Sequence, residues 1–217
     1  MKRVLEPEVM DTAEEADGYD SMDHSEPNAN FVARLIELGA RGRMLDIGTG
    51  PGQIPLLVCE KLATARVVGV DLSKQMLRHA ERHRLASRFA DRIEFRLADA
   101  KGLGFADGEF DCVYSNTILH HIPDPRPFLT EAWRVLRPGG VLLIRDLYRP
   151  ADDARADELV RLHAAGADEY QRGLFRASLC AAFEPDELRR LAREAGLTAD
   201  VVIDTDRHMS LQVRAKP

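Results

Sequence analysis

One stretch of the chain decides the fold, Met44-Leu45-Asp46-Ile47-Gly48-Thr49-Gly50-Pro51-Gly52, in which a short apolar run leads into three glycines at alternate positions. Glycine has no Cβ and readily adopts positive φ, so these glycines let a ligand lie close to the backbone. The helix that we expect to begin near Gln53 adds free N–H groups and the positive end of its dipole. The stretch therefore predicts a buried strand, a turn that holds a ligand, and a helix.

A second buried strand, residues 67–71, follows that helix and ends on the carboxylate of Asp71. In a doubly wound sheet an acid at this place accepts hydrogen bonds from the two hydroxyls of a ribose. The glycine turn and Asp71 together predict a site for a cofactor that contains a nucleoside.

The spacing of the glycines indicates which cofactor this is. Dinucleotide sites carry G-x-G-x-x-G, so the G-x-G-x-G of this chain disfavours a nicotinamide oxidoreductase. With Asp46 ahead of the glycines, the stretch resembles the first motif of class I S-adenosylmethionine-dependent methyltransferases. The resemblance implies that Gly48, Gly50 and Gly52 pass under the methionine part of S-adenosylmethionine.

Further motifs of this family follow in order, and the resemblance covers about residues 40–146. Residues 93–100 end on Asp99 and Ala100, where the resemblance implies an acid that bonds the adenine amine and a backbone N–H to the ring. Residues 110–116 form a fourth strand, and residues 136–140 resemble the turn into the fifth. We also assign Leu72 and Asn116 to the cofactor site.

The alternation of buried strands with amphipathic helices predicts an α/β fold: a doubly wound, mostly parallel seven-stranded sheet with helices on both faces, as in the Rossmann-like methyltransferase fold. Two short runs, 201–204 and 209–213, should form its antiparallel C-terminal edge. The helices are expected near residues 27–39, 53–63, 73–87, 126–137, 154–167, 170–182 and 185–195. We predict a single domain, 1–217, with an N-terminal cap segment (1–26), a cofactor-binding core (40–146), a helical lid insertion (151–183) and a C-terminal helix with edge strands (184–217).

Composition limits the partners of this domain. Its 217 residues carry a formal net charge of −6, so no bulk attraction draws it to nucleic acid or to anionic lipid. No apolar run reaches the roughly 20 residues of a membrane span, and we expect a cytoplasmic protein without membrane contact. Cys59, Cys112 and Cys180 are expected to be buried free thiols. The oligomeric state stays open.

The acceptor side of the site is expected after the fourth strand. Amino-directed nucleic-acid methyltransferases usually carry a polar residue, two prolines and an aromatic here, but Asn116 is followed by Thr117 and Ile118. His120 and His121 match a pair that is frequent in small-molecule methyltransferases. An imidazole with a near-neutral pKa is suited to take a proton, so His120 is our candidate base. The alternative is an imidazole that only caps or packs against the helix that begins near Pro125.

Asp146 ends the fifth strand and should face the same crevice, where it could orient the acceptor or act as the base. The alternative is a structural salt bridge to Arg149 or Arg176. At the other end of the chain, residues 11–26 are too polar for a core element. Tyr19, with Met22, could fold down over the cofactor.

Residues 151–183 are inserted after the fifth strand, so they should sit above the ligand crevice as a lid. We expect Tyr148, Tyr170 and Arg176 to contact the acceptor. A mere packing helix pair is the alternative.

These observations predict in-line transfer of a sulfonium methyl group to a small-molecule acceptor. No H-E-x-x-H, paired C-x-x-C or strand-turn serine motif is present, and we expect neither a metal site nor a covalent intermediate. The alternatives are an RNA or protein methyltransferase, or a catalytically silent subunit that binds S-adenosylmethionine. The identity of the acceptor and the atom that is methylated stay open.

Overall fold

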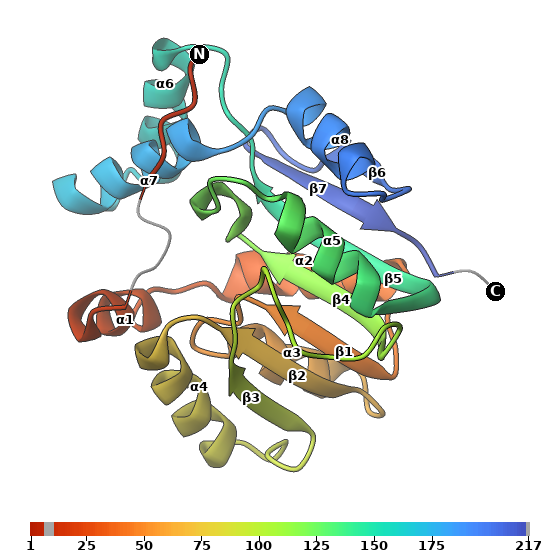
Figure 1. Ribbon diagram of the computed structural model, residues 1–217. Coiled ribbons are helices and arrows are strands. Elements are labelled where there is room, and N and C mark those ends of the chain that lie inside the picture. Colours follow the sequence, from red (N-terminus) through yellow and green to blue (C-terminus); the bar gives the residue numbers. More distant parts are fainter. Residues whose placement is uncertain (7–10, 216–217) are drawn as a thin grey trace.

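The protein, described by a computed structural model over residues 1–6 and 11–215, is built around a seven-stranded sheet (Figure 1). The order of the strands is β3-β2-β1-β4-β5-β7-β6, with β1 to β5 parallel and β7 antiparallel to both of its neighbours. This confirms the predicted fold class and its antiparallel edge. The strands are β1 (Arg43–Ile47), β2 (Arg66–Asp71), β3 (Ile93–Leu97), β4 (Phe110–Asn116), β5 (Leu136–Leu147), β6 (Asp200–Ile203) and β7 (His208–Val213).

The expected helices are all present, with ends that differ by a few residues from the predicted ones. A polar helix, α1, and a single 3₁₀ turn, η1, were not predicted from the sequence. Residues 7–10 of the expected cap and residues 216–217 of the expected C-terminal segment lie outside the described residues. The helices are α1 (Ala13–Asp20), α2 (Ser25–Glu37), α3 (Gln53–Lys61), α4 (Lys74–Ala86), η1 (Leu119–His121), α5 (Arg126–Val135), α6 (Asp153–His163), α7 (Glu169–Ala181) and α8 (Pro185–Glu194).

The sheet is covered on both faces because successive side chains of its strands point to opposite sides. Leu45 and Val113 pack with α5 and α8, whereas their neighbours Met44 and Cys112 pack with α2 and α3. The three cysteines are buried and form no disulfide, as predicted. None of the helices in the described part of the chain is both long enough and apolar enough to cross a bilayer.

The parallel strands point toward the side of the molecule where α1 and α7 lie (Figure 1). Helix α1 contacts α4, and α7 contacts both α6 and η1. The inserted residues 151–183 therefore stand at the carboxyl end of β5, beside the turn that follows β4. The carboxyl ends of the parallel strands, where such sheets hold their ligands, thus face the side of α1 and α7 (Figure 1).

Candidate functional site

The turn after β1 has the backbone that its glycines predict. Gly48, Gly50 and Gly52 have φ of 76°, 53° and 79°, all in the left-handed region. A Cβ on Gly48 would lie 2.5 Å from Cγ2 of Ile118, and one on Gly52 would lie 2.6 Å from Cζ of Phe95. Close packing thus requires glycine at the first and third of these positions.

Gly50 differs, because the nearest atom to a Cβ there is Cε1 of Tyr19 at 4.0 Å. The Tyr19 ring comes from α1 and covers the turn, where burial and the charges of Asp71 and Asp46 raise the pKa of its hydroxyl. Packing inside the protein therefore does not explain the middle glycine. Its φ of 53°, in the left-handed region, favours glycine there.

Two carboxylates lie beside the turn. Asp71, at the end of β2, accepts hydrogen bonds from the backbone N–H of Gly50 (2.8 Å) and of Ser73 (2.9 Å). Asp46, within β1, accepts one from the hydroxyl of Thr49 (2.8 Å). These bonds fix the shape of the turn and give it two acids, and such a place suits a ligand that carries positive charge and hydroxyl groups.

Burial changes the ionisation of both acids. Burial raises the pKa of Asp46 to about 8, and the charge of Asp71 adds to the rise. The hydrogen bond from Thr49 acts in the opposite direction and lowers the pKa. Burial also raises the pKa of Asp71, against the backbone N–H groups of Ser73 and Gly50. A cationic ligand would favour the ionised form of both acids.

This shift predicts a dependence of stability on pH. Asp46 holds its proton in the folded state up to about pH 8 but loses it near pH 4 when unfolded, so folding stability should fall as pH rises between these values. Asp46→Asn, which cannot ionise, should remove this part of the fall. Urea unfolding at pH 5, 6.5 and 8 measures both proteins, and equal losses in the two would contradict the prediction.

The remaining residues assigned to the cofactor line the same edge of the sheet. Leu72 follows Asp71 and is 41% exposed, which is unusual for a leucine beside a buried strand. Asp99 and Ala100 follow β3 and are half-buried, and Asp99 accepts a hydrogen bond from the backbone N–H of Lys101 (2.9 Å). Asn116 is half-buried at the end of β4. The structure thus brings the predicted cofactor residues to one edge, at the ends of four strands.

On the acceptor side, the structure joins the two predicted residues His120 and Asp146. His120 is 2% exposed on η1, and its Nδ1 lies 2.7 Å from Oδ1 of Asp146. Its backbone N–H donates to the other carboxylate oxygen at 2.9 Å. Since a carboxylate only accepts at its usual ionisation, Nδ1 carries the proton and the Nε2 of His120 points away from Asp146.

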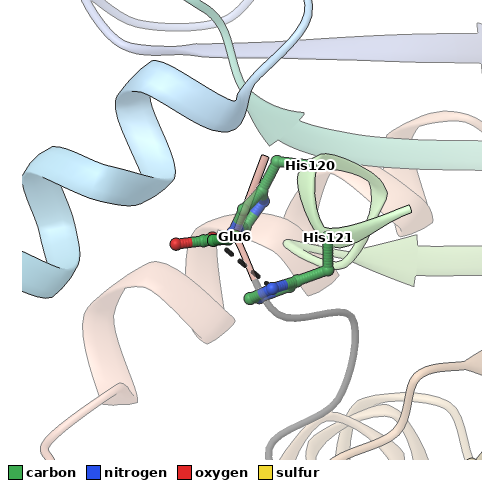
Figure 2. A group of neighbouring side chains, drawn as sticks. All are labelled: Glu6, His120 and His121. Carbon is green, nitrogen blue, oxygen red and sulfur yellow. Dashed lines mark ion pairs between the residues drawn. The ribbon is translucent and has the colours of Figure 1, made fainter. Parts of the chain in front are cut away.

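A third group, which the sequence did not suggest, meets that nitrogen (Figure 2). Oε1 of Glu6 lies 3.2 Å from Nε2 of His120 and 3.4 Å from Nδ1 of His121, and it accepts a hydrogen bond from the hydroxyl of Ser178 (3.1 Å). Burial opposes the charged imidazole, but the charges and hydrogen bonds of Asp146 and Glu6 together outweigh burial and raise the pKa of His120 to about 9. With only Glu6 facing Nε2, His120 is therefore a cation at neutral pH.

Glu6 is held in place by the chain around Arg3. The Arg3 guanidinium donates to the backbone oxygens of His120 and Ile122, both at 3.0 Å, and lies 3.7 Å from the ring centroid of Phe183. The backbone N–H of Val4 donates to the oxygen of Cys180 at 3.1 Å. The N-terminal residues thus pass between η1 and α7, which fixes the position of Glu6.

These contacts bear on the alternative roles of Asp146 and His120. The expected salt bridge of Asp146 to Arg149 or Arg176 is wrong, because Arg149 pairs with Glu184 and Glu187, and Arg176 pairs with Asp153 and Asp157. No side-chain hydrogen bond caps the start of α5, and a structural role of His120 stays the alternative hypothesis to its role as a base.

The three residues expected to contact the acceptor do not come together. The hydroxyl of Tyr148 donates to the backbone oxygen of Asp206 at 2.8 Å, and Tyr170 is 69% exposed. Arg176 joins α7 to α6 through its two aspartates. Of the predicted acceptor-side residues, only His120 and Asp146 form a buried group.

Comparison with known proteins gives this geometry a family. Residues 45–144 match the family model described as a methyltransferase domain. The chain is 35% identical over 160 residues to the 27-O-demethylrifamycin SV methyltransferase of Amycolatopsis mediterranei, over 68% of this chain and 57% of that protein. It is 30% identical over 176 residues to the ubiquinone biosynthesis O-methyltransferase of Chromobacterium violaceum, over 77% of this chain and 69% of that protein.

The chain spans about half the length of several further curated relatives, between 40% and 56%. Among solved structures, it resembles a SAM dependent methyltransferase from Aquifex aeolicus with a TM-score of 0.67, over 94% of this chain and 98% of that chain. The sequence identity of this pair is 19%, so the likeness concerns the fold alone.

Proposed function

Because the chain belongs to the class I S-adenosylmethionine-dependent methyltransferases, we propose that it transfers the methyl group of this cofactor to a small-molecule acceptor. One observation carries the proposal: the glycine turn with its two acids lies next to the buried pair of His120 and Asp146. Ile118, two residues before His120, packs against Gly48 and joins the two halves.

The residues beside the turn fit S-adenosylmethionine. Gly50 has no Cβ, so the cofactor could lie against its backbone where the Tyr19 ring now stands, and the acids Asp46 and Asp71 match the positive charge and the ribose hydroxyls of the cofactor. Asp99 and Ala100 would hold the adenine, with Leu72 beside it. Tyr19 and Asn116 would close the site on the opposite sides.

When bound, the cofactor supplies a methyl group on a sulfonium, so the chain has to align the acceptor, exclude water and take up a proton where the acceptor carries one. We assign the last task to His120, oriented by Asp146. In this role Nε2 must be neutral with its lone pair free, which requires Glu6 to move away from it.

Two observations favour a small acceptor. The names of the two relatives refer to a rifamycin and to ubiquinone biosynthesis. Helices α6 and α7 and the N-terminal residues also enclose the acceptor side, where Leu159 and Leu179 pack against the end of β5. A duplex or a folded RNA has little access to His120 past this cover. We propose that residues 151–183 select the acceptor by restricting this access.

The proposal is tested by measuring release of S-adenosylhomocysteine in the presence of small-molecule, RNA and peptide pools. Turnover with small molecules supports it. Turnover with RNA or peptides alone would favour the alternative acceptors, and cofactor binding without any turnover would favour a catalytically silent subunit.

Replacing Asp71 by alanine should weaken binding of S-adenosylhomocysteine by about ten- to 150-fold, because a hydrogen bond from an uncharged hydroxyl to a carboxylate is worth about 1.5 to 3 kcal/mol. Isothermal titration calorimetry measures this loss, and NAD should give no binding heat to the unaltered protein.

Asp71→Asn is the matched control, since it keeps the size of the side chain and one oxygen but lacks the charge. Gly50 and Ser73 donate to different oxygens of Asp71, so the amide keeps only one of these two bonds. We expect it to lose less affinity and less stability than Asp71→Ala. Binding of NAD without any response to S-adenosylhomocysteine would overturn the cofactor assignment.

A further inference from the structure

The side chains of Glu6, His120 and His121 converge at one point between η1 and the N-terminal residues (Figure 2). One donor atom from each lies within 4.8 Å of the others. We propose that these three residues bind a divalent transition-metal ion of the zinc type. The site goes beyond the proposed methyl transfer, which does not require it.

The distances from Glu6 to the two imidazoles fit an ion better than they fit charged hydrogen bonds. Charged N–H···O bonds measure about 2.7 to 2.9 Å, as the bond between His120 and Asp146 does at 2.7 Å. Glu6 stands farther off, 3.2 Å from one imidazole and 3.4 Å from the other. Donor atoms bound to one ion at about 2.1 Å, at 90° to 109° from each other, lie about 3.0 to 3.4 Å apart.

The hydrogen bonds that His120 and Glu6 make to residues outside the cluster are of the kind that orients metal ligands. A ligand histidine almost always donates its second ring N–H to a carboxylate or a carbonyl, which fixes the tautomer and the ring. Asp146 does this for His120 at 2.7 Å, so the lone pair of Nε2 points toward Glu6. The hydroxyl of Ser178 donates to the carboxylate of Glu6 in the same way.

Charge and ligand type agree with this assignment. The carboxylates of Glu6 and Asp146 together balance a doubly charged ion. Two imidazoles and one carboxylate suit zinc, iron or nickel better than magnesium or calcium, which prefer oxygen ligands. Three protein ligands leave at least one position for water or another oxygen ligand.

The ion and a proton compete for the same lone pair on Nε2 of His120. His120 is therefore a ligand in the metal-loaded protein and is available as a base only in the metal-free protein. The ion also ties Glu6 to η1, which joins the N-terminal residues to the turn after β4.

The test is titration of the full chain with Zn²⁺ by calorimetry, after removal of bound metal with a chelator. We expect one Zn²⁺ per chain. Glu6→Gln and His121→Ala should each weaken binding by about 100-fold, because loss of a residue that only hydrogen-bonds to a ligand already costs about 10- to 100-fold. Co²⁺ should give a visible absorption band that Glu6→Gln lacks. Melting temperatures confirm that the variants are folded, and Glu6→Gln keeps the size of the side chain.

His163→Ala is the control, since His163 also pairs with an acid, at 2.8 Å from Asp206, but lies outside the cluster. It should bind Zn²⁺ like the unaltered chain. Less than one ion per chain, or binding that is unchanged in both cluster variants, would overturn the proposal. None of these readouts depends on methyl transfer, so failure of the metal site and failure of the proposed function are distinguishable.

Discussion

Replacing His120 by asparagine is expected to lower the rate of methyl transfer by about 10² to 10⁴-fold while the affinity for S-adenosylhomocysteine stays nearly unchanged. The asparagine amide can donate to Asp146 from the place of Nδ1, but it has nothing in the place of Nε2. The variant thus keeps the buried bond and loses the nitrogen that faces the acceptor side. Turnover and calorimetry on the same preparation measure the two effects.

His120→Ala is the companion variant, because it leaves the carboxylate of Asp146 without its side-chain partner. We expect a loss of stability of about 3 to 5 kcal/mol, the usual cost of breaking a buried charge pair. If His120→Asn keeps full turnover, His120 has only a structural role. A loss of turnover in proportion to the unfolded fraction would lead to the same conclusion.

The glycine turn supports a second prediction, which separates its packing from its binding. Gly52→Ala should lower the free energy of unfolding by about 2 to 5 kcal/mol, because the methyl group meets Phe95 and the backbone of Ala80 at a left-handed φ. Gly50→Ala should cost about 1 to 2 kcal/mol, since only φ is unfavourable there.

For the affinity for S-adenosylhomocysteine we expect the opposite order, with the larger loss in Gly50→Ala and the smaller one in Gly52→Ala. Gly50→Ala should weaken binding of S-adenosylhomocysteine more than its small loss of stability implies, because its methyl group points toward Tyr19, where we place the cofactor. Urea unfolding and calorimetry on both variants make the comparison. A Gly50→Ala protein with unaltered affinity would show that the ligand does not pass over this glycine.

The sequence predicted the fold and the cofactor edge well because their determinants are local. The requirement for positive φ is carried by the glycines themselves, and Asp71 and Asp99 each stand at the end of a strand that a short apolar run reveals. Helix α8, expected near residues 185–195, begins at Pro185 behind a capping box on Glu184, which are signals that the local sequence carries. Polar α1 has no apolar stripe, and for this reason its helical state was not predicted.

The acceptor side was predicted only in part, because it depends on contacts between residues far apart in the chain. Asp146 meets His120 because β5 pairs with β4. The periodicity of the sequence does not encode this contact, because the two residues are far apart in the chain. Glu6 precedes His120 by more than half of the chain, in a polar segment without a motif. Its position depends on Arg3 and the carbonyl groups around it, which only a structure reveals.

The order of the strands bears on how the protein is made in the cell. β7, the last strand in the described part of the chain, lies in the sheet between β5 and β6. Until residues 208–213 leave the ribosome, the edge of β5 from Leu142 to Leu147 has no strand to pair with. Such an open apolar edge can template aggregation during synthesis. A chain that stops shortly before β7 would therefore carry the complete glycine turn but leave the edge of β5 open, and we expect it to aggregate more readily than the full chain.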